Sequence, residues 1–332
     1  MKTSDFDFYL PKELIAQTPP EKRDESRLMV VERTSGIFSH RDFHNIIEYL
    51  EEGDLLVVND TKVIPARIFT SAEDKKKREI LLIKEIAPFT WETFVKPQRG
   101  LNIGDSLTFA DDGLTAKVNE RTPGGTYILF FSKQPPLDKI GFAPLPPYIK
   151  RDYTKPDLHD YDKERYQTVY ANSPGAIAAP TAGLHFTPEL LEKIKTKGIK
   201  TASITLHVGI GTFRPVRADD VEDHTMLPEW FSIPEETTNL IKTAKRVIAV
   251  GTTTVRTLET SIEGSGYTNK FIYPPHEFKV VDALITNFHL PKSTLLMLIS
   301  AFAGRELIMK AYKKAIETGY KFYSYGDAML IL

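Results

Sequence analysis

Three histidines follow apolar residues at points where an extended or turn segment ends. They are His185 in APTAGLHFTPELLEKI, His207 in ITLHVGIGTFRPV and His289 in ALITNFHLPKSTLL. Histidine exchanges protons near neutral pH, and its neutral ring nitrogens also bind metal ions. This placement is compatible with acid–base chemistry, with a zinc site, and with hydrogen-bonded structural histidines, and the spacing alone requires none of them.

Other polar residues also follow short apolar runs. Gly209 and Gly211 come after SITLHV and allow a close approach of the backbone to a ligand. After RVIAVG come Thr252, Thr253 and Arg256, which together predict an anion site at a helix start. The same reasoning adds Asn287 and Asp327. A second cluster, in VEDHTMLPE, is suited to acid–base work or is simply a polar loop, and its members are Glu222, Asp223, His224 and Glu229.

Several common chemistries lack their sequence signatures. The chain has no cysteine, which excludes disulfides, thiolate nucleophiles and zinc–thiolate sites. GIG is not a GxGxxG fingerprint, and GTTTVRTLE lacks the glycine and lysine of a P-loop. There is no HExxH and no Gly-x-Ser-x-Gly elbow. Nicotinamide binding, nucleotide hydrolysis and serine acyl transfer are therefore not indicated.

The charge balance restricts the kind of partner. The 43 basic and 44 acidic residues give a formal charge of -1, so a nucleic acid would have to bind a local basic patch. The clearest basic run is KKKR at 75–78, which is equally typical of a solvated hairpin tip. The N-terminal stretch has no apolar signal region, and the longest nearly apolar run, 295–304, is about half a bilayer span. We therefore expect a soluble, cytoplasmic chain.

The spacing of apolar runs changes twice along the sequence. Residues 64–131 contain short apolar runs at about ten-residue intervals, separated by Gly, Pro and Asp, which predicts antiparallel β-structure. On both sides, helical patterns alternate with short buried strands, which is typical of a parallel sheet covered by helices. Helices are expected at 43–52, 187–198, 233–245, 253–262, 292–303 and 305–317, and a last strand at 321–326.

The predicted fold is thus an α/β domain with a mixed, mostly parallel sheet, formed by both chain ends, and an inserted antiparallel β-barrel. Its parts are residues 1–62 and 149–332 for the α/β domain and residues 63–148 for the insert. In an open α/β sheet, ligands bind at the carboxyl ends of the strands. The polar residues above all fall at such predicted ends, so we expect them to converge.

Several long strings stand out along the sequence: LPKELIAQTPPEKRDESRLM, GDLLVVNDTKVIPARI, PLPPYI, APTAGLHFT, TLHVGIGTFRPV, VIAVGTTTVRTLE, VVDALITNFHLPKSTLLMLISAFAG and YSYGDAMLI. In the same order, from Asp5 to Leu332, they resemble the S-adenosylmethionine:tRNA ribosyltransferase-isomerases of queuosine synthesis. The resemblance implies an α/β domain with an inserted β-barrel and a metal-free transferase without a cofactor. In that family, the ribosyl part of S-adenosylmethionine is moved onto the aminomethyl group of a 7-deazaguanine at the tRNA wobble position.

Roles for individual residues follow from the chemistry of that reaction. A base must remove a ribose C5′ proton beside the sulfonium, and an acid helps adenine to leave. We expect the acid–base groups to be His185, His207, Glu222 and His289. Substrate contacts are expected from Thr181, Gly183, Gly209, Gly211, Thr212, Asp223, His224, Thr252, Thr253, Arg256, Asn287 and Asp327. Within these, Arg256 with Thr252 and Thr253 would hold the methionine carboxylate.

The tRNA requires phosphate contacts, which the insert is expected to supply. The predicted basic track is Arg67, Lys75, Lys76, Lys77, Arg78, Lys96 and Arg99.

The chain is expected to act as a monomer. Where the family usually reads His-x-Met-His-x-Glu, this chain has Leu227 in place of the second histidine. Two alternatives are a hydrolase with zinc on the three histidines and a tRNA-binding protein without catalysis.

Overall fold

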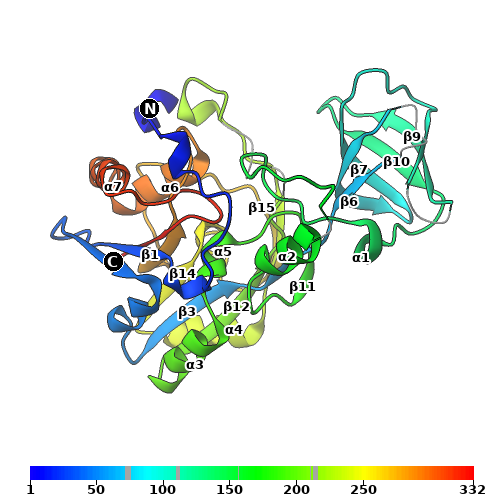
Figure 1. Cartoon of the computed structure of the whole chain (residues 1–332). Helices are drawn as coiled ribbons and strands as arrows, with labels where there is room; N and C mark the ends of the chain where they lie inside the picture. The colour runs from blue at the N-terminus through cyan, green and yellow to red at the C-terminus, as the bar shows by residue number, and fades with distance from the viewer. Residues whose placement is uncertain (72–75, 110–112, 156, 210, 212–215) are drawn as a thin grey trace. The chain divides into compact units, whose positions relative to one another are not determined.

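The computed structural model describes all residues except 72–75, 110–112, 156, 210 and 212–215. The chain forms two compact units (Figure 1). Unit 1 consists of Met1–Lys62, Pro146–Arg151 and Gln167–Leu332, and unit 2 of Val63–Leu145 and Asp152–Tyr166. That residues 1–62 and 149–332 form one α/β domain and residues 63–148 an inserted domain stays a prediction. In the described part of the chain, no helix combines the length and apolarity needed to cross a membrane.

Unit 1 is built on a nine-stranded mixed sheet. In spatial order its strands are β15 (Gly264–Thr268), β13 (Glu229–Ile233), β12 (Lys200–Leu206), β3 (Asp54–Asn59), β14 (Arg246–Val250), β16 (Ala283–Asn287), β17 (Ala328–Ile331), β1 (Arg27–Val31) and β2 (Phe38–Asp42). The run β12–β3–β14–β16 and the pair β17–β1 are parallel, whereas the four other neighbouring pairs are antiparallel.

The expectation of a mostly parallel sheet was therefore wrong, although a mixed sheet with helices is present. One reason lies between β16 and β17, where two packed helices, α6 (Thr294–Ala303) and α7 (Arg305–Glu317), follow one another. A single crossover helix returns the chain to the start of the sheet and gives a parallel neighbour. A second helix takes the chain back again, so that β17 runs antiparallel to β16.

Both faces of the sheet are buried, which explains the nearly continuous apolar strands. Leu55 and Val57 on β3 face one core, whereas Leu56 and Val58 face the other. The first core contains side chains of α4 (Glu235–Thr243), α5 (Thr252–Leu258), α6 and α7. The second contains α3 (Pro188–Thr196) and the 3-10 helices η4 (Phe43–Tyr49) and η5 (Thr181–His185). The helix expected at 43–52 is thus a 3-10 helix.

Local sequence signals account for several element ends. The Thr187 side chain accepts a hydrogen bond from the backbone N–H of Leu190, and Pro188 begins α3, as expected for a cap followed by proline. Gly198 follows this helix with a φ of 85°.

The remaining short elements of unit 1 are 3-10 helices and a small sheet. The 3-10 helices are η1 (Thr3–Phe6), η2 (Lys12–Leu14), η3 (Arg23–Glu25) and η7 (Val221–Asp223), and a two-stranded sheet joins β4 (Thr61–Val63) to β11 (Ser173–Ala176).

The last strand was misplaced by the sequence pattern. Residues 321–326 form a tight turn, in which the Gly326 N–H donates to the Tyr323 carbonyl at 3.0 Å. The strand that joins the sheet is β17, which begins at Ala328. The Asp327 carboxylate takes up the backbone N–H groups of Arg27 and Lys321, at 2.8 and 2.7 Å. An N–H held by a side chain is lost to a strand ladder, and KFYSYG accordingly stays outside the nine-stranded sheet, with Phe322 forming an isolated parallel bridge to Ile15.

Unit 2 contains a six-stranded antiparallel sheet. Its order is β5 (Arg67–Phe69), β6 (Glu79–Ala87), β7 (Thr90–Lys96), β10 (Tyr127–Phe131), β9 (Thr115–Arg121) and β8 (Ser106–Thr108). The sheet is curled, since its two edges meet at a bridge between Thr70 and Phe109. Side chains alternate between buried and more exposed along β7, as expected for a sheet with one packed face. Short helices α1 (Leu137–Ile140) and α2 (Asp157–Arg165) complete the unit.

Candidate active site

At one end of its strands, the nine-stranded sheet gathers polar residues from distant parts of the chain. This line of strand ends is called the sheet edge below. The strands β12, β3, β14 and β16 are parallel, so their carboxyl ends lie at this edge. Strands β13, β17 and β1 run the other way, so their amino ends lie there too. The edge therefore carries His207, Asn59, Thr252, Thr253, Asn287 and His289 from the first group and Glu229, Asp327 and Ser26 from the second.

His185, at the end of η5, is buried and 3% exposed. Its Nδ1 lies 2.7 Å from the Ser26 hydroxyl, and its Nε2 lies 3.0 Å from Asn287 Nδ2. Burial, together with the positive charge of Arg23, lowers the pKa of His185 to about 3. The ring is neutral, and both its nitrogens are occupied.

His289 lies two residues beyond β16 and is 8% exposed. Its Nε2 lies 2.8 Å from the Thr286 hydroxyl, and its backbone N–H donates to the Tyr312 hydroxyl at 2.8 Å. Burial lowers the pKa of His289 to about 3. Like His185, it is a neutral, hydrogen-bonded side chain near pH 7.

His207 has a different environment, although it follows β12 directly. Its ring is half-buried, stacks on Trp230 with centroids 5.0 Å apart, and places Nδ1 2.8 Å from the Thr61 hydroxyl. Burial lowers its pKa, and the nearby Asp60 carboxylate opposes that effect. Among the described residues, Nε2 has no hydrogen-bonding partner.

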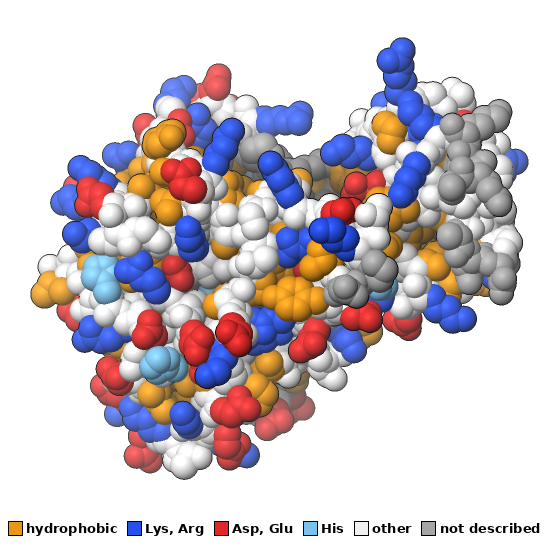
Figure 2. Space-filling view, in the orientation of Figure 1, with side chains coloured by type: hydrophobic (Ala, Val, Ile, Leu, Met, Phe, Trp, Pro, Cys, Tyr) orange, Lys and Arg blue, Asp and Glu red, His pale blue; other side chains and the backbone are white. Residues whose placement is uncertain are grey.

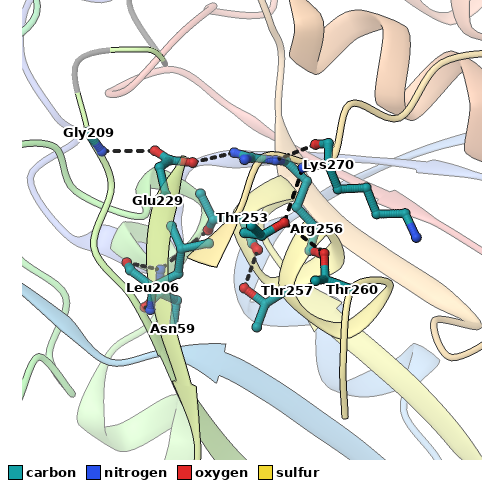
Figure 3. A network of polar contacts seen from close by, with 10 residues as sticks. Asn59, Leu206, Gly209, Glu229, Thr253, Arg256, Thr257, Thr260 and Lys270 are labelled. Atoms are coloured by element: carbon teal, nitrogen blue, oxygen red, sulfur yellow. Dashed lines mark hydrogen bonds and ion pairs between the residues drawn. The ribbon is translucent and has the colours of Figure 1, made fainter. Parts of the chain in front are cut away.

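A buried ion pair connects three elements of the edge (Figure 3). Glu229 Oε2 lies 2.5 Å from Arg256 Nη1, and the side chains are 6% and 4% exposed. The other oxygen, Oε1, accepts the Gly209 N–H at 2.9 Å, while Arg256 Nε donates to the Lys270 carbonyl at 3.1 Å. Arg256 Nη2 is buried and has no partner in the described part of the chain. One nitrogen of the guanidinium is thus left without a hydrogen-bonding partner in the described residues.

Asn59, at the end of β3, holds the neighbouring strand end in place. Its Oδ1 accepts the backbone N–H groups of Leu206 and Thr61 at 3.0 and 3.1 Å. Its Nδ2 donates to the Leu206 carbonyl at 3.0 Å and reaches the Thr253 hydroxyl at 3.5 Å. Asn59 therefore fixes the positions from which His207 and Thr253 project. Thr252 and Thr253 are themselves buried in the first turn of α5.

Comparison with known proteins can now be set beside this geometry. The model of the family described as "Queuosine biosynthesis protein" matches residues 3–331. The chain belongs to this family. It is 50% identical to the S-adenosylmethionine:tRNA ribosyltransferase-isomerase of Desulforamulus reducens and 51% identical to that of Thermotoga maritima, with 100% of both chains covered in each case. A crystal structure of an S-adenosylmethionine tRNA ribosyltransferase from Thermotoga maritima is similar with a TM-score of 0.57 and 42% identity, covering 99% of this chain and 100% of that one.

Within this queuosine biosynthesis family member, the acidic cluster of VEDHTMLPE separates into two parts. Glu222 on η7 is exposed and pairs with the Met1 amino group at 2.8 Å, which lowers its pKa. Asp223 is exposed as well, and His224 packs against the Phe271 ring. Glu229 is the member that reaches the sheet edge. Their proposed roles stay predictions, as does that of Thr212, which lies outside the described residues.

Glu229 and Asn59 also lie at this edge, although neither is among the site residues expected from the sequence. Both are polar residues at the start or end of an apolar strand, which was the signal used for Asn287 and Asp327. Asp327 itself lies before β17 rather than at the end of a strand, and its carboxylate is occupied by backbone N–H groups. Burial raises its pKa.

The three histidines were also considered as zinc ligands. Within the ranges that the structure describes, no three His, Asp or Glu side chains are grouped so that they could hold a metal ion. Two of the three rings instead serve hydrogen bonds inside the fold.

Thr181 and Gly183 lie on η5, and Gly183 is tightly enclosed. A Cβ at this position would lie 2.0 Å from the Tyr170 hydroxyl and 2.8 Å from Thr168 Cγ2. Substituting Gly183 with alanine is expected to lower the free energy of unfolding by about 1–3 kcal/mol, because the added methyl group overpacks the site. Urea unfolding measures this change.

The Tyr170 hydroxyl is buried without a partner among described residues. Combining Gly183→Ala with Tyr170→Phe is therefore expected to recover part of the loss. Gly211→Ala is the matched control, since its Cβ would lie at an ordinary 3.8 Å from Leu227. Equal destabilisation by Gly183→Ala with and without Tyr170→Phe would refute the steric explanation.

Proposed function

We propose that this chain transfers and isomerises the ribosyl moiety of S-adenosylmethionine onto the aminomethyl group of 7-aminomethyl-7-deazaguanine at the tRNA wobble position. The products are epoxyqueuosine-tRNA, adenine and methionine. The observation that carries the proposal is the identity of about half of all residues, over the whole chain, to enzymes named for this activity. S-adenosylmethionine is a co-substrate, and the proposal includes no cofactor and no metal. We expect a monomer that works in the cytoplasm.

The sheet edge offers groups suited to each part of the reaction. A base is needed for the ribose C5′ proton and an acid for the departing adenine. Of the groups predicted for these roles, His185, His207 and His289 lie at this edge, whereas Glu222 lies exposed on η7 and pairs with the Met1 amino group. Methionine ends in a carboxylate, which suits the unpartnered Nη2 of Arg256. Because Glu229 already balances the single positive charge of that guanidinium, the carboxylate would bind through hydrogen bonds more than through net charge.

The tRNA is proposed to contact unit 2. Arg67 and Arg78 are poor candidates for phosphate contacts, since their guanidinium groups donate within the unit: Arg67 to the Leu145 carbonyl, and Arg78 to the Pro97 and Gly100 carbonyls. Lys75 lies outside the described residues. The side chains that remain exposed are Lys76, Lys77, Lys96 and Arg99. On the face shown in Figure 2, basic and acidic side chains are interspersed over unit 1, so a local patch rather than the whole surface has to attract the tRNA.

Charge reversal tests this surface. The double variant Lys76→Glu with Lys96→Glu is expected to raise the KM for tRNA about tenfold or more and to leave the KM for S-adenosylmethionine unchanged, because phosphate contacts contribute additively to tRNA affinity. Steady-state kinetics with each substrate varied in turn measure both constants. The control is Lys195→Glu, an exposed lysine on α3 of unit 1. An unchanged KM for tRNA in the double variant would remove unit 2 from the proposed interface.

The decisive experiment for the activity is product analysis. Purified, chelator-treated protein is incubated with S-adenosylmethionine and a tRNA that carries the aminomethyl-deazaguanine. Equimolar adenine and methionine, formed with that tRNA and not with unmodified tRNA, are expected. If folded protein binds the tRNA but releases no adenine, the activity is refuted, and tRNA binding without catalysis explains the chain better.

A further inference from the structure

The ring of His207 is held from two sides, by Thr61 and Trp230. Thr61, on β4, is 0% exposed and places its hydroxyl 2.8 Å from Nδ1. Trp230, on β13, stacks on the imidazole with an interplanar angle of 25°. The hydrogen bond to the hydroxyl fixes the direction in which Nδ1 points, and stacking on the indole fixes the orientation of the ring plane. Nε2 is the nitrogen that this arrangement leaves unoccupied.

A glycine keeps that nitrogen accessible. At Gly175, on β11, a Cβ would lie 2.8 Å from His207 Nε2 and 2.9 Å from Cε1. Any other residue would therefore press its side chain against the reactive edge of the ring. The φ of 147° is one that side-chain-bearing residues rarely adopt, so local conformation and space both require glycine here.

The other two histidines of the edge are more deeply buried than His207. His185 has both ring nitrogens bonded, whereas His289, like His207, has one bonded, its Nε2 to Thr286. Both are nearly inaccessible to solvent, at 3% and 8% exposure. A group that passes a proton to or from a substrate must reach it within hydrogen-bonding distance. His207 is the histidine that meets this condition.

We propose that His207 Nε2 is the atom that removes the ribose C5′ proton, with Thr61 and Trp230 as positioning residues and Gly175 as the opening to that atom. The assignment rests on the proposed function. The C5′–H bond breaks, its electron pair stays on the carbon beside the sulfonium, and an N–H bond forms at Nε2. During this step Nδ1–H donates to the Thr61 hydroxyl, so neutral imidazole becomes imidazolium and the sulfonium becomes its ylide.

Chemical rescue tests the role of the imidazole. The variant His207→Ala is expected to lower kcat for adenine release by about 10²–10⁴-fold, the usual contribution of a positioned acid–base group, with little change in the KM for S-adenosylmethionine. Added imidazole is expected to restore kcat, and more basic imidazoles to restore it further. A ring that serves packing alone would show no such dependence on basicity. His44→Ala, an exposed histidine of the same unit, is the control.

The positioning residues have their own test. Thr61→Val is expected to lower kcat about tenfold at unchanged KM for S-adenosylmethionine, and Thr61→Ser to restore it, because serine keeps the hydroxyl bonded to Nδ1. Circular dichroism and urea unfolding confirm that each variant folds. The more conservative His207→Gln serves in addition if His207→Ala does not fold.

The outcomes separate the two levels of the proposal. If the wild-type protein releases no adenine, the proposed function fails and the assignment fails with it. If the wild-type protein is active, but folded His207 variants keep most of their kcat or do not respond to imidazole, the assignment alone is overturned. A loss of kcat in Thr61→Ser as large as that in Thr61→Val would overturn the positioning role of the hydroxyl.

Discussion

Replacing Arg256 with alanine is expected to lower the free energy of unfolding by about 3–5 kcal/mol, because it leaves a buried carboxylate without its counter-charge. Glu229 is 6% exposed and lies 2.5 Å from the guanidinium. Its second oxygen accepts one N–H, from Gly209. That bond compensates part of the desolvation of the carboxylate, and the remainder is carried by Arg256. Urea unfolding followed by circular dichroism measures the change.

Two further variants isolate the charge effect. The double variant Arg256→Met with Glu229→Gln is expected to be more stable than Arg256→Ala, since it removes both charges and keeps most of the volume. Lys2→Ala breaks an ion pair of similar length, 2.8 Å, whose side chains are 59% and 43% exposed, and is expected to change stability little. If Arg256→Ala and Lys2→Ala lowered the free energy of unfolding by the same small amount, the Glu229–Arg256 pair would contribute little to stability.

The same pair links stability to the proposed reaction. Glu229 connects the strand that precedes Gly209 with the helix that carries Arg256, so the variants above are also expected to disturb substrate binding. A stability loss of this size is a large fraction of what an ordinary domain possesses. Activity of the variants should therefore be compared at a temperature at which each is fully folded.

Much of the fold could be predicted because local patterns and global packing agree. The cap at Thr187, the short strands of unit 2 and the apolar strands of unit 1 each follow from residues close in sequence. The direction of β17 could not be predicted in this way, since it depends on how two consecutive helices, α6 and α7, return the chain to the sheet. The Asp327 side chain that ends the turn before β17 acts on backbone groups of Arg27 and Lys321, and such long-range contacts leave no periodic pattern.

For the candidate site, too, the sequence does not show the contacts between distant segments. The sequence identifies which polar residues end apolar strands, and the topology brings those strand ends to one edge. It does not distinguish the three histidines, because their difference lies in partners from other segments: Ser26 for His185, Thr61 for His207. Glu229 was not selected because its partner, Arg256, is 27 residues away on a different element. Burial and pairing decide these roles, and both are properties of the folded chain.

Lowering the pH from about 7 to about 5 is expected to reduce the free energy of unfolding by about 4 kcal/mol through the two buried histidines alone. His185 and His289 have pKa values of about 3 in the folded protein, below the ordinary value of 6.5. As the pH falls below that ordinary value, the unfolded chain binds protons that the folded chain does not. Stability is therefore fully present above about pH 6.5 and is lost progressively toward pH 3.

A single substitution tests this dependence of the free energy of unfolding on pH, because it removes one titrating group. In His289→Gln, the dependence of the free energy of unfolding on pH between about 5 and 7 should fall by roughly half of the two-histidine contribution, about 2 kcal/mol over that range. The control substitution is His44→Gln, at an exposed position. The raised pKa of Asp327 acts in the opposite direction, because the folded protein then takes up a proton before the unfolded chain does. Identical slopes for wild type and His289→Gln would show that His289 becomes charged within the fold, and a neutral role for it would have to be abandoned.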